Sequence, residues 1–314
     1  MINEHKENPE KSVSSIASVA IVFILLFLAI AASGQNVSDG NLSAAESEAD
    51  MLFMLLQIQA DVQGKLNDLD SDLANAAQNL STTRLEGPAA RGVLRKLLET
   101  NSNLPGTLTF GTMNKEGKII TSECKGCENV SIQDRLSMHS AENLSPTAIE
   151  LIAHVMKTKT PAFSKAFMTV EGFTGANLEY PVFSSQGEFM GGVGAVFEPD
   201  KLLNALVAPQ LHFNNSTRSN ITDYSFWIWQ PDGLIAYDRD ADQIGNNIFK
   251  DPLYKPFPSV LALGKKIIAE RAGHGSYSFQ VSEANKSVVT KDAYWTTAGL
   301  HGSDWRLIIT RIMQ

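Results

Sequence analysis

An uncharged apolar run near the start of the chain is the strongest pattern in the sequence. Residues 12–38 contain no charged side chain, and residues 16–33 would form a helix of about 27 Å, close to the thickness of the hydrocarbon core of a bilayer. Two lysines precede the run, and the next basic residue after it is Lys65. This Lys/Arg bias predicts a cytoplasmic tail over residues 1–11, a transmembrane anchor or uncleaved signal over 12–38, and an extracytoplasmic remainder.

Two other interpretations of the run stay open. The small residues of Ala29-Ile30-Ala31 fit a cleavage site, so the run could be a secretory signal that is removed. The stretch Lys11 to Val19 vaguely resembles the N-termini of archaeal pilins, which enter filaments through such a helix. The signal and anchor interpretations export the same domains.

Helical periodicity predicts a long stalk over residues 40–104. Apolar side chains recur at steps of three and four from residue 46 to residue 82, and a second helical pattern covers residues 89–101 after Gly87 and Pro88. The apolar positions of the long helix are Leu55, Ile58, Val62, Leu66, Leu69, Leu73, Ala76 and Leu80. This seam could form a homodimeric coiled coil or pack against the domains of its own chain.

Beyond residue 105 the same order of elements occurs twice. Each copy predicts a hairpin, one helix, one strand and a final hairpin. The first copy covers residues 108–113, 118–121, 145–157, 162–170, 176–183 and 190–197, and the second covers 224–229, 234–238, 258–270, 275–281, 293–298 and 305–311. Gly117 and Gly233 are separated by nearly the same interval as Tyr180 and Tyr294, which indicates a duplication. The predicted fold class is α+β: a long N-terminal stalk helix followed by two antiparallel sheet domains.

Composition narrows the function classes. The formal charge of −8 comes without a basic stripe, which argues against nucleic-acid binding. Glycosylation acceptor sequences are frequent, as suits an exported glycoprotein. They begin at Asn36, Asn41, Asn79, Asn129, Asn143, Asn214, Asn215, Asn220 and Asn285.

The two cysteines are close together in a polar segment. Cys124 and Cys127 have no second pair that would complete a zinc site, and they follow no strand-to-helix junction of the thioredoxin type. We expect a local disulfide between them, because an extracytoplasmic compartment is oxidising.

Several segments of the second half resemble a known family. Pro231 to Asn246, Ala269 to Tyr277 and Ala293 to Arg306 are similar, in order and spacing, to the double Cache domains, PAS-like extracellular sensor modules of prokaryotic receptors. The resemblance covers about residues 40 to 312. It implies two PAS-like domains, a membrane-distal Cache domain over residues 105–210 and a membrane-proximal one over 211–314, with the small ligand most often in the distal domain.

The resemblance also has departures. Typical family receptors continue into a cytoplasmic output domain, whereas this chain ends at Gln314 soon after its last predicted strand. A form lacking an output domain is therefore expected to signal through an unidentified partner protein. In family members that bind amino acids, the resemblance implies a pattern of Tyr, Arg, Trp and Asp in the distal pocket, but all 4 tryptophans of this chain lie in its second half. An amino-acid ligand is therefore unsupported by the sequence.

Candidate ligand-binding residues come from strand alternation. Phe163, Lys165, Phe167 and Thr169 would share one face of a strand, with Tyr180 on the next. Lys165 could neutralise the carboxylate of a metabolite, or its stem could cover apolar surface while its amine reaches water. In the second half we select Tyr237 and Asp238, beside a comparable set made of Tyr277, Lys291 and Trp295, and we expect Trp295 to belong to the core.

Motifs for catalysis and metal binding are missing from the sequence. The carboxylates that follow Asp238 alternate as in a calcium loop, but Gln243 stands at the position of the EF-hand glycine and Phe249 at that of its glutamate. The histidines are scattered, and there is no nucleophile elbow or phosphate loop. We expect no enzyme activity, cofactor or metal.

The sequence thus predicts a membrane-anchored extracytoplasmic domain that binds a small molecule, most plausibly one bearing a carboxylate, and signals through partner proteins. The alternative is a structural or filament-forming cell-surface protein in which the Cache folds act as spacers. An open cavity on the distal sheet would favour binding, whereas a filled core would favour the spacer.

Overall fold

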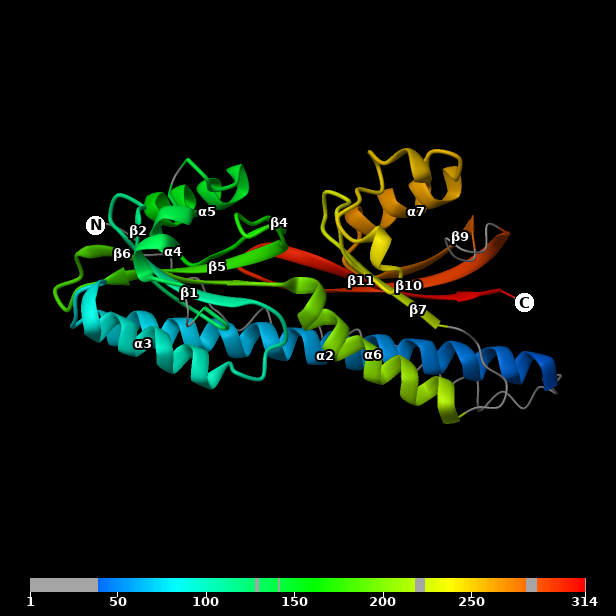
Figure 1. Cartoon of the computed structure of the whole chain (residues 1–314). Coiled ribbons are helices and arrows are strands. Elements are labelled where there is room, and N and C mark those ends of the chain that lie inside the picture. Colours follow the sequence, from blue (N-terminus) through cyan, green and yellow to red (C-terminus); the bar gives the residue numbers. More distant parts are fainter. Residues whose placement is uncertain (1–38, 128–129, 141, 218–223, 281–286, 314) are drawn as a thin grey trace, which may run out of the picture. The chain divides into compact units, whose positions relative to one another are not determined.

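The computed structural model describes residues 39–127, 130–140, 142–217, 224–280 and 287–313. The predicted anchor over residues 16–33 lies outside these ranges. Within them, no helix combines the length and apolar character needed to cross a bilayer. The chain divides into two compact units, Met1–Glu48 and Ala49–Gln314, and both sheets belong to the second unit. The predicted α+β class is confirmed (Figure 1).

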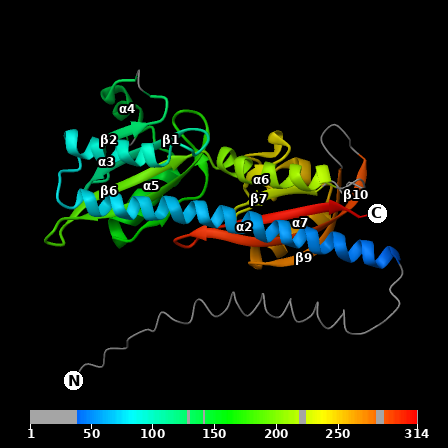
Figure 2. The ribbon, with the colours of Figure 1, turned by 90° about the horizontal axis from the view of Figure 1, so that it is seen from below.

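The long helix α2 (Asp39–Leu80) presents one apolar face to its own chain. All eight predicted seam residues, from Leu55 to Leu80, are at most 2 % exposed and belong to one core with both sheets. Helix α3 (Gly87–Thr100) follows after a short connection and adds Ala90, Leu94 and Leu97 to this core. Figure 2, seen from below, shows α2 running in front of the strands of both sheets. Of the two predicted uses of the seam, the structure has the packing against its own sheets.

The first sheet is antiparallel, with the order β2-β1-β6-β5-β3, and β4 pairs with β5 beside β3. Its strands are β1 (Leu108–Asn114), β2 (Ile119–Cys124), β3 (Ala162–Phe163), β4 (Phe167–Met168), β5 (Thr174–Phe183) and β6 (Phe189–Phe197). Helices α4 (Ile132–Met138) and α5 (Pro146–Thr158) cover the face opposite α3 (Figure 1). We call this sheet with α4 and α5 the first lobe.

The second sheet has the order β8-β7-β11-β10-β9. Its strands are β7 (Tyr224–Trp229), β8 (Ile235–Asp238), β9 (Gly273–Gln280), β10 (Val288–Leu300) and β11 (Ser303–Ile312). Helix α6 (Pro199–Thr217) connects the two sheets, and η2 (Ala241–Gln243), η3 (Pro252–Tyr254) and α7 (Pro258–Ala269) follow β8. We call the second sheet with η2, η3 and α7 the second lobe.

The predicted duplication is confirmed by the matching strand orders. Both lobes begin with a hairpin whose turn closes in the same way: the amides of Gly117 and Gly233 donate to the carbonyls of Asn114 and Gln230, each at 2.9 Å. Both glycines have a positive φ, 79° and 85°, which a side chain would strain. The sequence interval between them thus reflects a repeated turn geometry.

Some predicted elements differ in the structure. The strand expected over residues 162–170 is interrupted, because Ser164 still pairs with Asn177 while Lys165 leaves the sheet. Helices α4 and α6 were not predicted, and α6 contains residue 210, where the sequence places the border between domains. The domain limits themselves stay predictions. The acceptor sequences at Asn36, Asn129, Asn220 and Asn285 lie outside the described residues.

Candidate functional site

A small cavity lies on the face of the first sheet that α4 and α5 cover. Its volume is about 50 Å³, enough for one or two water molecules. Its wall combines glycines of β1 and β6 and apolar side chains of β1, β2, α5 and β6 with polar groups. The polar lining residues are Thr109, Thr112, Ser122, His139, Asn177 and Glu179. A polar cavity under a sheet is unusual for a core that serves only to hold a fold together.

Glu179 is the charged group at the centre of this cavity. Its side chain is 6 % exposed and lies over β6, where Gly194 is its register partner. A Cβ at Gly192 would come within 2.6 Å of Oε1 of Glu179, and one at Gly194 would overlap with Oε2. The glycines of β6 therefore make room for the carboxyl group.

Burial dominates the electrostatics of this glutamate. Loss of solvent raises the pKa of Glu179 to about 8, while a hydrogen bond from Asn177 opposes the rise. None of the ion pairs among the described residues includes Glu179. Nearby, Oδ1 of Asn177 and Oγ of Ser122 are buried without hydrogen-bond partners. The cavity thus gathers acceptor atoms around a carboxyl group that has no ion-pair partner among the described residues, since the lining His139 pairs with Glu171.

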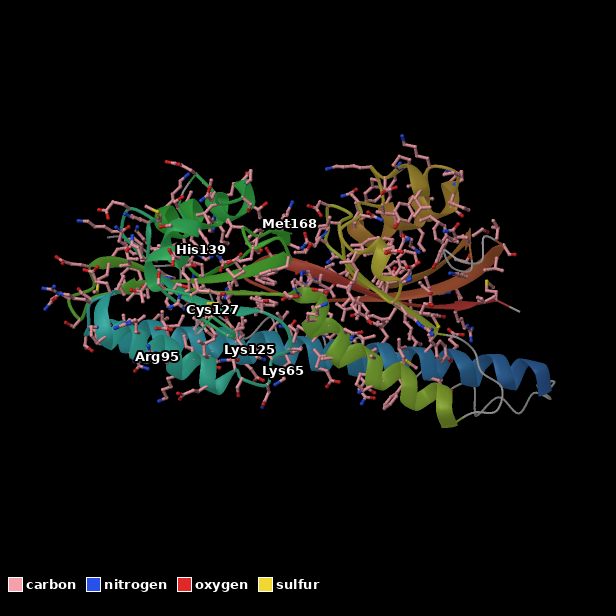
Figure 3. The ribbon with its side chains drawn as sticks, viewed as in Figure 1. Lys65, Arg95, Lys125, Cys127, His139 and Met168 are labelled. Atoms are coloured by element: carbon pink, nitrogen blue, oxygen red, sulfur yellow. A yellow bond between two sulfur atoms is a disulfide. The ribbon has the colours of Figure 1, made fainter. Side chains whose placement is uncertain are left out.

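His139, which lines the cavity, forms an ion pair with a residue of a neighbouring turn. His139 lies at the end of α4 (Figure 3). Its Nε2 lies 2.9 Å from Oε1 of Glu171, which belongs to the turn between β4 and β5. Its Nδ1 contacts the carbonyl of Arg135 at 2.7 Å. The hydrogen bond with Glu171 raises the pKa of His139 despite burial. Burial alone would raise the pKa of Glu171. Its hydrogen bonds and the charge of His139 outweigh burial, so the pKa of Glu171 is lowered.

The predicted first-half residues do not line the cavity. Lys165 forms an ion pair with Asp232 of the second lobe at 3.2 Å, and Phe167 lies on the short strand β4, partly buried. Tyr180 donates a hydrogen bond to Asp70 of α2 at 2.7 Å, so it faces the stalk side of the sheet. Alternation along β5 explains this: Asn177 and Glu179 point to the cavity, and Tyr180 points the opposite way.

The second-half candidates also separate between two faces. Tyr237 is buried on the α6 side, where its hydroxyl donates to Asn204 at 3.4 Å, and burial raises its pKa to about 12. Asp238 lies on the other face, where burial raises its pKa to about 7. Burial also lowers the pKa of Lys291, which the charge of Asp238 opposes.

In the second lobe, aromatic side chains fill the layer that corresponds to the one containing the cavity in the first lobe. Its core includes Trp227, Trp229, Tyr254, Tyr277, Phe279 and Trp295. Trp295 is 2 % exposed, and its Nε1 donates to the carbonyl of Glu270 at 3.1 Å. Trp295 is therefore a core residue, as expected, and the first lobe is the better candidate for a ligand site.

The two cysteines are joined by a disulfide, with their Cα atoms 5.4 Å apart. The bond closes the turn from Cys124 to Cys127 at the end of β2. Cys124 also accepts a 3.5 Å contact from the guanidinium group of Arg135. Among the described residues, no three His, Cys, Asp or Glu side chains form a group that could hold a metal ion.

Glu179, Asn177 and His139 are not among the candidate residues predicted from the sequence. A signal for Glu179 was present: the strand that pairs with it contains Gly191, Gly192 and Gly194, and such a run leaves space above a sheet. His139 carried no comparable signal, because its partner Glu171 is 32 positions away and belongs to a different element.

Comparisons with known proteins agree with this architecture. Residues 64–199 match the family described as HK/GC/chemotaxis protein-like, sensor domain. None of the curated proteins matches the sequence. An extracellular ligand-binding receptor from Desulfohalobium retbaense is 27 % identical, with a TM-score of 0.61 over 82 % of this chain. This chain spans 39 % of the length of that receptor.

Two further structures have the same fold at lower identity. The ligand-binding domain of the Pseudomonas aeruginosa amino-acid chemoreceptor PctB, in complex with L-Arg, is 15 % identical and has a TM-score of 0.55, with 85 % of this chain and 96 % of that chain covered. The periplasmic sensory domain of the Campylobacter jejuni chemoreceptor Tlp1 is 14 % identical and has a TM-score of 0.58, with 85 % and 95 % covered. The chain therefore has the fold of the Cache-like sensor domains found in chemoreceptors and histidine kinases, and residues 64–199 match their sensor-domain family, in agreement with the resemblance to the double Cache family.

Proposed function

We propose that this chain is an extracytoplasmic, membrane-anchored sensor whose first lobe binds a small solute bearing a protonated amine. One observation carries the proposal: a buried carboxyl group, Glu179, lies in a polar cavity without a cationic partner. A buried carboxylate is costly unless it is paired. An ammonium group would pair with it.

The surrounding atoms suit an ammonium donor. Such a group has three N–H donors, and the cavity offers the carboxylate of Glu179 with the unpartnered oxygens of Asn177 and Ser122. The carboxylate-bearing ligand expected from the sequence relied on Lys165, which pairs with Asp232 instead. A ligand carboxylate would gain no ion pair from Glu179, because a carboxyl group carries no positive charge in either protonation state.

The size of the cavity limits its occupant. About 50 Å³ admits only a very small amine unless α4 and the turn containing Glu171 move apart. We propose that ligand entry opens the His139–Glu171 link, so that a bound amine favours one arrangement of α4 over another. The same small volume favours the alternative, a surface protein with its folds as spacers, and the experiment below decides between the two.

The comparisons support a ligand of this class. The PctB domain is described in complex with L-Arg, and the Pseudomonas fluorescens chemoreceptor CtaA in complex with L-serine; both ligands carry an amine as well as a carboxylate. These proteins share the fold at 15 % identity. We extend the presence of an amine, and not the identity of either ligand, to this chain.

Anchoring and signalling complete the proposal. Residues 16–33 would hold the N-terminus in the membrane, and a bound ligand would be reported through contacts with a partner protein. A change in the arrangement of the first lobe can reach α2, because Tyr180 on β5 contacts Asp70 on that helix.

Calorimetric titration of the full chain tests the ligand class. The probes are methylammonium, L-serine and acetate, and the variants are Glu179→Gln and, as a matched control on the same lobe, Lys165→Ala. We expect at least one amine to bind and acetate not to bind. Glu179→Gln should weaken amine binding at least tenfold, and Lys165→Ala should leave it unchanged.

Proton release provides a second measurement. Because the pKa of Glu179 is about 8 without ligand, binding an ammonium group below that pH should expel a proton. Titrations at pH 7 in buffers of different ionisation enthalpy would reveal it. If neither amine binds the parent chain, or if Glu179→Gln binds it equally well, the spacer function is the better account.

A further inference from the structure

We infer that the first lobe has a second binding site, an arginine-lined groove for a small organic oxyanion with an apolar part. The groove lies between α3, the end of β2, the disulfide loop and α4, and its volume is about 590 Å³. This is the size of a pocket for a single small molecule. It is separate from the cavity that contains Glu179.

Three guanidinium groups contribute to the wall of the groove. Arg91 and Arg95 come from successive turns of α3, and Arg135 comes from α4 on the opposite side. Figure 3 shows Arg95 on α3 and Cys127 in the neighbouring loop. Two carboxylates, Glu99 and Glu123, line the same groove, so one positive charge is left uncompensated.

Arg135 is the group that most needs a ligand. It is 8 % exposed, and its Nε is buried without a hydrogen-bond partner. Its Nη1 has only long contacts, 3.5 Å to Sγ of Cys124 and 3.7 Å to Oε2 of Glu123. A guanidinium group carries five N–H donors, and burying them without acceptors is costly. Oxygen atoms of an anion would supply those acceptors.

The two arginines of α3 differ in how much they are already engaged. Arg95 lies 3.4 Å from Oε1 of Glu123, with its side chain 60 % exposed, so it is only loosely held. The Arg91 side chain is partly buried and takes part in none of the side-chain hydrogen bonds or ion pairs of the described residues. An arginine fork suits a carboxylate or a phosphate equally well.

Apart from Ser131, the remaining wall is apolar, which points to an organic anion. Leu98, Val130 and the Cys124–Cys127 disulfide line the groove, and Val130 is 39 % exposed. A ligand with an apolar body would cover these side chains while its oxyanion meets the arginines. Inorganic phosphate would satisfy only the charged part of the site.

Titration of the full chain with three probes tests the site. Benzoate combines the oxyanion with an apolar body, inorganic phosphate has the oxyanion alone, and benzyl alcohol has the apolar body alone. We expect benzoate to bind at least tenfold more tightly than either of the others. Tighter binding of phosphate would assign the site to free phosphate and overturn the organic class.

Variants separate this site from a non-specific charge effect. Arg91→Ala and Arg95→Ala should each weaken benzoate binding about tenfold, whereas Arg84→Ala, on the exposed loop before α3, should not change it. Glu99→Gln should strengthen binding severalfold, because it removes a repelling carboxylate. Arg135→Lys, which retains the charge but removes Nε, should lose most of the affinity.

The outcomes also distinguish this inference from the proposed amine site. Benzoate binding should be the same in Glu179→Gln as in the parent chain, and amine binding should survive Arg91→Ala. No binding of benzoate, or equal effects of Arg84→Ala and Arg91→Ala, would overturn the inference. Because Arg91 and Arg95 are at least partly exposed, their variants remain informative even if Arg135→Lys fails to fold.

Discussion

Glu179 and Gly194 are register partners in β5 and β6, and the glutamate carboxyl group fills the space that a side chain at position 194 would need. The glycine therefore does more than permit close packing: it allows a carboxyl group to lie flat on the sheet in a buried layer. The two residues together make the cavity both polar and narrow. Changes at either residue should therefore affect both the free energy of unfolding and the binding of a ligand.

Glu179→Gln should stabilise the protein, and the gain should depend on pH. The raised pKa means that the folded chain keeps a proton that the unfolded chain loses between pH 4.5 and about 8. Stability of the parent therefore falls as the pH rises through this window, whereas a glutamine pays no such penalty. We expect a gain of up to about 3 kcal/mol at pH 7 and little difference at pH 4.

Urea unfolding of both proteins across the pH range measures this gain. A constant difference between Glu179→Gln and the parent would contradict a buried, titrating carboxyl group. Increased stability together with lost amine binding would be the signature of a group kept for function at the expense of stability.

Gly194→Ala should displace the carboxyl group of Glu179. The new Cβ would also lie 3.1 Å from the carbonyl oxygen of Leu178, so the strand has little freedom to adapt. We expect a loss of about 1–3 kcal/mol and much weaker amine binding. Gly64→Ala is the control, because its Cβ would meet no atom within 4 Å on α2 and should stabilise the helix by about 1 kcal/mol. A Gly194→Ala protein that keeps full stability and amine affinity would contradict the role of Gly194 in making room for Glu179.

Much of the fold followed from periodicity, because it depends on local patterns. The seam of α2 and the paired hairpins around Gly117 and Gly233 are recorded in spacings of a few residues. Helix α6 was missed because it contains Pro209, which normally argues against a helix interior. The strand after Ala162 was overestimated because alternation cannot reveal that Lys165 leaves the sheet for Asp232.

The candidate site was harder to predict, because it depends on which face of a strand points to which layer. Glu179 and Tyr180 are neighbours in sequence, yet one lies in the cavity and the other contacts α2. Alternation predicts that the two must differ in face, but only the packing of α2 decides which face is the stalk side.

The link between His139 and Glu171 should show its own pH window. The raised pKa of His139 gives a contribution to stability that is complete below pH 6.5 and lost as the pH rises through the folded value. The lowered pKa of Glu171 gives one that is present above pH 4.5 and lost as the pH falls through its folded value. The link is therefore strongest between these limits.

Titration of the His139 ring by NMR measures the first limit directly. In the parent chain the transition should occur above pH 6.5, and in Glu171→Gln it should move to lower pH, because the hydrogen bond with Glu171 is the largest cause of the shift. An unchanged midpoint in that variant would show that another group sets the pKa.

Contacts between the two lobes should depend on apolar packing more than on charge. Phe163 of β3 is 3 % exposed and packs against Phe197 at 6.2 Å and against Trp305 of β11 at 5.4 Å between ring centroids. Lys165 and Asp232, in contrast, form a pair whose side chains are 58 % and 39 % exposed. We expect Phe163→Ala to cost about 3–5 kcal/mol and Lys165→Ala less than about 1 kcal/mol.

Urea unfolding of the two variants, with added salt as a second condition, checks this order. Salt should weaken only the small contribution of Lys165, since screening acts on exposed charges and not on stacked rings. A Lys165→Ala protein as unstable as Phe163→Ala would mean that the ion pair holds the lobes together. If Lys165→Ala also lost amine binding, Lys165 would have to act on the cavity from the lobe boundary. Glu179 could then not be the main determinant of amine binding.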